Sequence, residues 1–489
     1  MTALQLIILV IVLSACSISA KLSYSKGGAR TRFEEKFQKT CSKYKFVDKY
    51  LENIKNPSND YLIFVFHEAG QKAHGGLGDR VAGMITAMAY AIRTERTFLL
   101  QGDQAFEDAF RPYFPPDEEG KALSEHFTWK SWDWANWNRE YASNMTKLPC
   151  INPHKNAHHC SLDLHYHNKF KVIKYYGNRS YLCRWLIKPS LGLRKELVET
   201  LGITERSNLY EVAGCMLRLA MWPTDHLWTA LDDSLEAQFH QSNQFSSPGD
   251  ASAANTGDKS IVSTSKQIGF HFRCGDTSFS ATKNSAPNPE CYFDTTGKVP
   301  WKGTAFSDDH SLDSPLDEAK CGQKLLQQAS SPATAVGASA SVSGSPNNSA
   351  SGGVLAYIAS DNGDSAVQIN STLAWPFAIK PPEACHMDIQ KSTHCTLTTT
   401  LHWFMLSLSD VLVMQALIKP PESVYSNSPE TAHLKDEEPA PISAFSRYAA
   451  IYSLSPEVIR YGRGCHTANT TALSYQTHGN WVCDPKMFY

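Results

Sequence analysis

Residues that can bind an anion lie at the end of a short apolar stretch in the second half of the chain, at residues 267–276. Apolar and polar residues alternate up to His271, and Arg273 and Asp276 follow. This period of two predicts a strand that brings these three side chains to its carboxyl end, where ligands bind in open α/β sheets. The planar guanidinium of Arg273 suits a phosphate better than a lysine would. The stretch predicts an anion site, with a sheet-edge ion pair as the alternative.

A glycine-rich loop much earlier in the chain predicts a second anion site. An apolar run at residues 61–66 leads into it, and the loop contains Gly75, Gly76 and Gly78. Helical periodicity follows from Val81 to Ile92, before another apolar run at residues 97–100. Glycines let the backbone approach a ligand at a helix amino end, where free N–H groups favour negative charge, although such loops also close ordinary turns. Together the two sites predict an α/β protein with two facing Rossmann-like domains.

Five motifs follow one another along most of the chain, as separate short segments. They are residues 75–80 with 93–100, 271–276, 356–361, 406–413 and 443–447. Together they resemble the GDP-fucose fucosyltransferase superfamily, which includes plant xyloglucan, rhizobial Nod-factor and animal core α1,6 enzymes. The resemblance implies a GT-B fold and inverting transfer of fucose from GDP-fucose to a glycan or glycoprotein acceptor.

The resemblance also implies roles for individual residues at the donor site. Arg273 would stabilise the pyrophosphate, His271 would lie against the nucleotide, and Asp361 would approach the nucleoside. The glycine loop would complete the donor site, and three residues of the last motif would hold the phosphate: Ser443, Phe445 and Ser446. No cofactor is implied.

Two positions depart from the pattern of the family. Several relatives have a second basic residue where this chain has Cys274, so that binding of the pyrophosphate would depend more on Arg273. In the core α1,6 branch an acidic residue reads guanine at the position aligned with His402. Preference for guanine is therefore inferred from the resemblance alone.

The catalytic base has three candidates. Inverting transfer needs a carboxylate or imidazole within hydrogen-bond reach of the acceptor hydroxyl. Asp276 ranks first because a strand fixes its position, and Glu68 and Asp79 lie in the glycine loop. Asp276 could equally orient Arg273, and Asp79 could cap the following helix.

The donor site is predicted to work without a metal. Fixed arginine and backbone donors can stabilise a leaving diphosphate, and the acidic pairs at residues 308–309 and 361–364 make no convincing metal dyad. A loop at residues 150–167 is rich in histidine and could ligate zinc, but its spacing matches no familiar finger. Cys150 and Cys160 within it could instead form a disulfide.

An acceptor platform is predicted where residues 127–137 hold four of the 11 tryptophans. Aromatic faces stack on the C–H surfaces of sugars, which favours acceptor binding by Trp129, Trp132 and Trp134. Burial of these rings between domains is the alternative.

The N-terminus predicts entry into the secretory pathway, with the Golgi lumen as the expected location. Residues 1–19 read as a cleaved signal peptide or a short signal anchor, and a bacterial lipobox ending at Cys16 is a further reading. Five Asn-x-Ser/Thr sites count against a bacterium: Asn144, Asn178, Asn347, Asn370 and Asn469.

The rest of the chain divides into a stem and two domains. Residues 20–60 are expected to form a stem and lead-in helix, residues 61–240 the acceptor-side domain, and residues 241–489 the donor-side domain. Low-complexity insertions are predicted at residues 241–266, 327–352 and 415–441, because such segments have little apolar surface to bury.

The cysteine count predicts disulfides. Loss of Cys16 with the signal leaves an even number of the 13 cysteines, as is usual in secreted proteins. Cys274 could be a free buried thiol. The plausible local pairs are Cys291 with Cys321, Cys385 with Cys395, and Cys465 with Cys483.

Composition narrows the class of partner. A net charge of −2 and the lack of a basic run with interleaved aromatic residues exclude a nucleic-acid-binding surface. Besides the fucosyltransferase, three alternatives stay open: a transferase for another nucleotide sugar, a catalytically inactive carbohydrate-binding relative, and a zinc-dependent luminal protein.

Overall fold

A computed structural model places the following parts of the chain. It describes residues 28–55, 60–65, 76–102, 104–114, 172–175, 199–203, 207–244, 266–272, 354–360, 378–379, 392–414, 444–454, 459–461 and 466–468, with Gly177, Ser180 and Leu182. Among these residues, no helix has both the length and the apolar character needed to cross a membrane. The predicted signal or anchor at residues 1–19 lies outside the described residues.

A parallel sheet forms from the first third of the chain. Its strands β1 (Tyr61–Val65), β2 (Thr97–Gln101) and β4 (Val172–Tyr175) run in the order β2-β1-β4. Helix α4 (Leu77–Arg93) connects β1 to β2, and every residue of β1 is buried. The strand, helix and second strand predicted from the apolar runs and the helical period are therefore confirmed, while most of the loop between β1 and α4 lies outside the described residues.

A six-stranded sheet forms from the second half of the chain, with the order β11-β10-β9-β6-β7-β8. All neighbouring pairs are parallel except β10 with β11. The strands are β6 (Lys266–Phe272), β7 (Val354–Ser360), β8 (Ala378–Ile379), β9 (Val411–Met414), β10 (Ile459–Tyr461) and β11 (His466–Ala468). Counted along the chain, this is the 3-2-1-4-5-6 order of doubly-wound nucleotide-binding folds.

Strand β6 occupies the middle of this sheet, between β7 and β9. The predicted strand is confirmed, but its two faces do not differ in the way that alternation suggests. Ile268, Gly269, Phe270 and His271 are all buried. The reason is position, because an internal strand of a mostly parallel sheet is covered on both faces.

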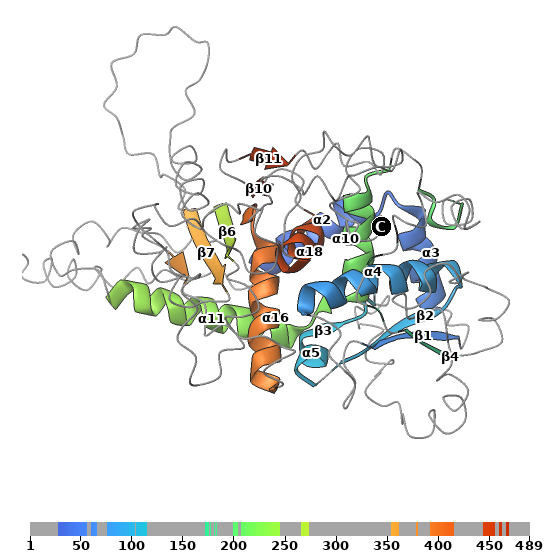
Figure 1. The fold of residues 1–489 in the computed structure, drawn as a ribbon, viewed down its shortest axis with the longest axis horizontal. Coiled ribbons are helices and arrows are strands. Elements are labelled where there is room, and N and C mark those ends of the chain that lie inside the picture. Colours follow the sequence, from blue (N-terminus) through green and yellow to red (C-terminus); the bar gives the residue numbers. More distant parts are fainter. Residues whose placement is uncertain are drawn as a thin grey trace, which may run out of the picture.

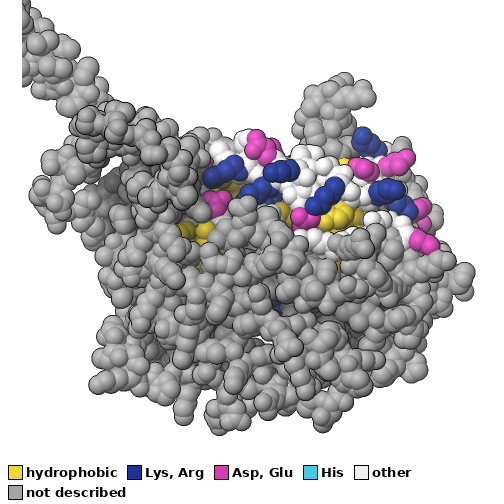
Figure 2. Space-filling model, turned by 90° about the horizontal axis from the view of Figure 1, so that it is seen from above, with side chains coloured by type: hydrophobic (Ala, Val, Ile, Leu, Met, Phe, Trp, Pro, Cys, Tyr) yellow, Lys and Arg dark blue, Asp and Glu magenta, His cyan; other side chains and the backbone are white. Residues whose placement is uncertain are grey.

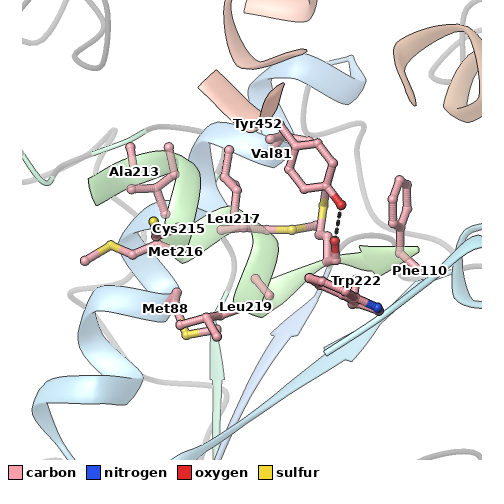
Figure 3. Packing of buried hydrophobic residues seen from close by; sticks show 14 of the residues in the cluster. Val81, Met88, Phe110, Ala213, Cys215, Met216, Leu217, Leu219, Trp222 and Tyr452 are labelled. Atoms are coloured by element: carbon pink, nitrogen blue, oxygen red, sulfur yellow. Dashed lines mark hydrogen bonds between the residues drawn. The ribbon is translucent and has the colours of Figure 1, made fainter. Parts of the chain in front are cut away.

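Helices fill the space between the two sheets (Figure 1). Helix α10 (Leu209–Ala220) packs on α4 and on α18 (Ala444–Ser453), and α18 packs in turn on α16 (Thr393–Leu408). Apolar side chains of α10 such as Leu219 lie beside Met88 of α4 (Figure 3). Helix α5 (Gln104–Ala109) packs on α16 and contacts β3 (Phe110–Arg111), which pairs with β5 (Trp222–Pro223).

The first two helices belong to the folded core. Helix α2 (Gly28–Cys41) buries Phe33 and Phe37, and α3 (Lys45–Lys55) buries Tyr50. Their outer surface carries charges of both signs close together (Figure 2), including the ion pairs of Arg30 with Glu34 and of Lys49 with Glu95. The segment predicted as a stem and lead-in helix thus contains helices that pack against the rest of the protein.

A disulfide that local spacing did not predict joins α2 to α10. Cys41 and Cys215 are both fully buried, and they are 174 residues apart in the chain. Cys395 at the start of α16 is also disulfide-bonded, to a partner outside the described residues. The other cysteines of the predicted local pairs lie outside the described residues.

One predicted boundary falls inside a helix. Helix α11 (Asp225–Gln244) continues past residue 240, where the first domain was expected to end. Apolar residues at helical spacing, such as Leu227 and Leu231, are buried on one side of this helix. The polar residues after residue 239 extend the same helix by one turn, because their low hydrophobicity does not by itself end a helix.

Candidate functional site

The amino ends of α4 and α18 are in direct contact. Gly78, in the first turn of α4, lies so close to α18 that a Cβ atom would overlap the carbonyl carbon of Ala444 and the nitrogen of Phe445. The same Cβ atom would lie 2.7 Å from the carbonyl oxygen of Ala444. Glycine is therefore required here by close backbone approach. Two helix amino ends, each the positive end of a helix dipole, are brought together.

The carboxyl end of β6 reaches the same place. The imidazole of His271 stacks on the ring of Phe445, with the ring centroids 5.1 Å apart and the planes at 29°. His271 is only 7% exposed, and it pairs with Met414 at the end of β9. The glycine loop, the histidine strand and the last motif, which are far apart in the sequence, thus meet at one site.

This site lies at the carboxyl ends of β6 and β9, in the middle of the six-stranded sheet. Strand order reverses between β6 and β9, because the chain goes from β6 to β7 on one side and later returns to β9 on the other. In open α/β sheets ligands bind outside the carboxyl ends of the strands at such a switch point. Arg273 follows the last residue of β6 in the sequence and lies outside the described residues.

Helix α18 is fixed at its other end by a buried cation. The guanidinium of Arg218 on α10 donates to the carbonyl oxygens of Tyr452 at 2.8 Å, Ser453 at 2.9 Å and Phe33 at 2.6 Å. It also lies 3.7 Å from the centre of the Phe33 ring. Burial lowers the pKa of Arg218 to about 9. The carbonyls at the end of a helix carry partial negative charge, so this arginine stabilises the end of α18.

Hydrogen bonds and close packing join α10 to α18 at further points. The Tyr210 hydroxyl donates to the Ala450 carbonyl, and the Tyr452 hydroxyl donates to the Met221 carbonyl (Figure 3). At Gly214 a Cβ atom would collide with the Ile451 carbonyl oxygen. These contacts fix the carboxyl half of α18 against α10.

The amino end of α18 is held by α16. The indole Nε1 of Trp403 donates to the carbonyl oxygen of Phe445 at 3.0 Å. Trp403 is fully buried and packs against Tyr452, with ring centroids 4.9 Å apart. Sequence analysis missed both Trp403 and Arg218, and no periodicity or motif spacing would have identified them, because their partners are backbone carbonyls of distant segments.

His402 is buried beside β7. Its ring meets the ring of Tyr357 edge to face, with centroids 6.1 Å apart. Within the described part of the chain, neither its Nε2 atom nor the Tyr357 hydroxyl has a hydrogen-bond partner. Burial lowers the pKa of His402 to about 4, so the imidazole is neutral near pH 7. It therefore presents one donor and one acceptor rather than the negative charge of a carboxylate.

Two residues of the motifs have structural roles instead. Asp410 joins the amino ends of β6 and β9, since its Oδ2 accepts from the Gln267 N–H and its own N–H donates to the Gln267 carbonyl, both at 2.9 Å. Arg96 is buried where β2 begins; burial lowers its pKa, and attraction to Asp60 opposes that shift. Asp410 thus lies at the amino ends of these strands, whereas His271 lies at the carboxyl end of β6.

The other predicted site residues divide into two groups. Asp79 and Gly76 lie at the amino end of α4, and Ser446 is buried in the first turn of α18. The remaining ones lie outside the described residues, and their roles stay predictions: Glu68, Gly75, Trp129, Trp132, Trp134, Arg273, Asp276, Asp361 and Ser443.

No metal site can be assigned within the described ranges. No group of three or more His, Cys, Asp or Glu side chains there is arranged to hold an ion. The histidine-rich loop at residues 150–167 lies outside those ranges.

Comparison with known proteins gives matches among solved structures only. No family model matches the chain, and no curated protein matches it. The chain is similar to a mutant of Arabidopsis thaliana FUT1 in complex with GDP, with a TM-score of 0.40 and 12% identity over 91% of this chain and 79% of that one. It is also similar to the NodZ alpha-1,6-fucosyltransferase soaked with GDP-fucose, with a TM-score of 0.34 and 13% identity over 82% and 94%. Fucosyltransferase NodZ from Bradyrhizobium gives a TM-score of 0.33 and 14% identity over the same shares. Both NodZ structures are described as fucosyltransferases, and the FUT1 mutant is described as a complex with GDP.

Proposed function

We propose that this protein is an inverting fucosyltransferase that transfers fucose from GDP-fucose to a glycan acceptor. The observation that carries the proposal is the meeting of Gly78, His271 and Phe445 at the switch point of the six-stranded sheet. Each of the three residues belongs to a motif that resembles the fucosyltransferases. A donor diphosphate needs a site that favours negative charge, and these three residues meet at such a site.

In this proposal the chain has a GT-B fold, with two Rossmann-like domains on either side of the donor. The acceptor-side domain would contain β1, α4 and β2, and the donor-side domain would contain the six-stranded sheet. Trp129, Trp132 and Trp134 would form the platform on which the acceptor sugar stacks. Asp361, which follows the end of β7, would contact the nucleoside.

The proposed reaction is a single displacement. The acceptor hydroxyl oxygen attacks C1 of fucose, the bond from C1 to the β-phosphate oxygen of GDP breaks, and the hydroxyl proton passes to a base. Negative charge develops on the leaving diphosphate, where Arg273 and the N–H groups of two helix amino ends would stabilise it. Fixed donors of this kind make a metal ion unnecessary. Asp276 is the first choice for the base, followed by Glu68 and Asp79.

The buried disulfide supports a location in the secretory pathway. Disulfides persist in oxidising compartments, and the bond between Cys41 and Cys215 is built into the core. Together with the signal or anchor predicted at residues 1–19, this favours the Golgi lumen, where donor and glycoprotein acceptor would be available.

A transferase for another nucleotide sugar is the second candidate, and His402 is the observation that favours it. A neutral imidazole replaces the carboxylate that reads guanine in the core α1,6 branch. Thermal shifts measured with GDP, UDP and CMP sugars separate the two candidates. Stabilisation by GDP-fucose alone supports the fucosyltransferase, whereas preferential stabilisation by a UDP or CMP sugar supports the alternative.

The proposal is tested by incubating the purified protein with GDP-fucose and a glycan array, with and without excess EDTA. We expect fucose on a subset of glycans and a rate within about twofold in EDTA, since no step uses a metal. Binding of GDP-fucose without transfer to any glycan would indicate an inactive carbohydrate-binding relative. Loss of activity in EDTA and its return with Mn²⁺ would contradict the metal-independent site.

A further inference from the structure

The peptide group between Ala444 and Phe445 is enclosed from the side of α4. Gly78 leaves no space for a side chain between α4 and this peptide. The ring of Phe445 in turn stacks on the imidazole of His271 at the end of β6. Any rotation of this first turn of α18 would move both contacts at once, so the site depends on what holds the turn in place.

Trp403 is the side chain that holds it. Its indole N–H is directed at the Phe445 carbonyl, 3.0 Å away, and the ring is fully buried. The ring is fixed by Tyr452 of α18 and by Phe110 of β3, whose ring meets it at 81° with centroids 6.1 Å apart. A buried donor held by packing on two sides has one orientation available, which makes its hydrogen bond directional.

The hydrogen bond is in addition to those of the helix. Phe445 lies in the first turn of α18, where its N–H has no partner within the helix and only its carbonyl contributes to the helical pattern. A second donor on that carbonyl fixes the rotation of the turn about the helix axis. The phenyl ring is thereby kept against His271 at the end of β6.

We propose that Trp403 is a positioning residue for the donor site, which acts through Phe445 without touching the nucleotide. This inference rests on the proposed function, because it assigns the site at α18 and β6 to a nucleoside diphosphate. It adds a residue that neither the motifs nor their roles in the family assign. It also explains how a residue on α16 affects a site built from α4, α18 and β6.

The test compares Trp403→Phe with a matched control, Trp228→Phe. Trp228 is also buried in the aromatic cluster, where it packs on Phe33 and Phe404 with ring centroids 5.8 Å and 4.9 Å apart. Both variants lose the same atoms, but only Trp403→Phe loses a donor to Phe445. The measurements are the Kd for GDP by calorimetry, the unfolding temperature, and the donor KM and kcat.

We expect Trp403→Phe to weaken GDP binding about fivefold, the equivalent of one neutral hydrogen bond, and to raise the donor KM with kcat within about twofold. Trp228→Phe should bind GDP within about twofold of the wild type, while both variants unfold at lower temperature. Equal GDP affinity in Trp403→Phe and the wild type would overturn the inference and leave the fucosyltransferase proposal intact. Equal weakening in both variants would also overturn it, because it would show a general loss of stability.

A measurement on the wild-type protein covers the case in which Trp403→Phe does not fold. The indole N–H signals of Trp403 and Trp228 are followed by NMR during a titration with GDP. A shift of the Trp403 signal alone is expected. An unmoved Trp403 signal at saturating GDP would overturn the inference, and absence of any GDP binding by the wild type would overturn the proposed function together with it.

Discussion

His271 and Phe445 stack face to face, 5.1 Å between ring centroids, although 173 residues separate them in the chain by their numbers. The first ends an internal strand, and the second begins a helix that packs on three other helices. Because a strand and a helix hold the two rings, the stack forms a rigid surface for a bound ligand. The predictions below test whether this place binds a nucleotide sugar and what holds it together.

Gly78→Ala is expected to force α4 and α18 apart. The added methyl group would overlap backbone atoms of Ala444 and Phe445, which cannot move aside as a flexible side chain would. We expect a loss of about 1–3 kcal/mol in the free energy of unfolding, together with weaker GDP binding. Urea unfolding and calorimetry measure the two effects.

Gly214→Ala is the comparison for that variant. Its methyl group would collide with the Ile451 carbonyl at the carboxyl half of α18. It should destabilise the protein to a similar extent but change GDP affinity less, because the collision lies away from Phe445. A Gly78→Ala protein with wild-type stability and GDP affinity would show that the two helix ends are not in contact.

The buried His402 should make stability depend on pH. Its folded pKa of about 4 lies below the usual value of 6.5 because burial disfavours the charged form. The unfolded chain therefore binds a proton that the folded protein does not, so the stabilising contribution is complete above pH 6.5 and is lost as the pH falls toward 4. Between pH 7 and pH 4.5 this amounts to on the order of 2–3 kcal/mol.

His402→Phe isolates this effect, since it keeps an aromatic ring against Tyr357. Urea unfolding of both proteins at pH 7 and at pH 4.5 gives the free energies. The variant should lose less stability than the wild type over that interval. Parallel losses in the two proteins would mean that His402 takes up its proton with a normal pKa in the folded state.

The disulfide between Cys41 and Cys215 should be a major source of stability. It closes a loop of 174 residues and restricts the unfolded chain accordingly. We expect the double variant Cys41→Ala with Cys215→Ala to lose about 2–5 kcal/mol, measured by chemical unfolding without reductant. An unchanged unfolding midpoint would show that the two thiols are not bonded in the native protein.

The catalytic base is identified by amide substitution. Asp276→Asn, Glu68→Gln and Asp79→Asn each remove one candidate with little change in size. At saturating donor and acceptor, the true base alone should show a fall in kcat of about 10²–10⁴-fold, with GDP affinity unchanged. Near wild-type turnover in all three would favour a water-relayed reaction without a dedicated carboxylate.

Local patterns predicted the elements well and their assembly only in part. The segments that form β1 and β2 were identifiable as apolar runs, α4 by its helical period, and β6 by its period of two. Family motifs indicated that Gly78, His271 and Phe445 belong to one site. The supports of that site could not be found in this way. Arg218 and Trp403 hold carbonyl groups of remote segments, and any residue type can supply a carbonyl. The bond from Cys41 to Cys215 was missed for a related reason, since local spacing favours short loops over one of 174 residues.

The affinity for GDP, measured by calorimetry on the wild type and on Arg273→Ala, tests the central claim most directly. Arg273 follows β6 in the sequence, and it is proposed to bind the diphosphate next to His271. The account predicts that the wild type binds GDP more tightly than UDP or CMP, and that Arg273→Ala binds GDP about 10–100-fold more weakly because paired charge-assisted hydrogen bonds are lost. Equal GDP affinity in the two proteins, or no binding of GDP by a folded wild type, would contradict it.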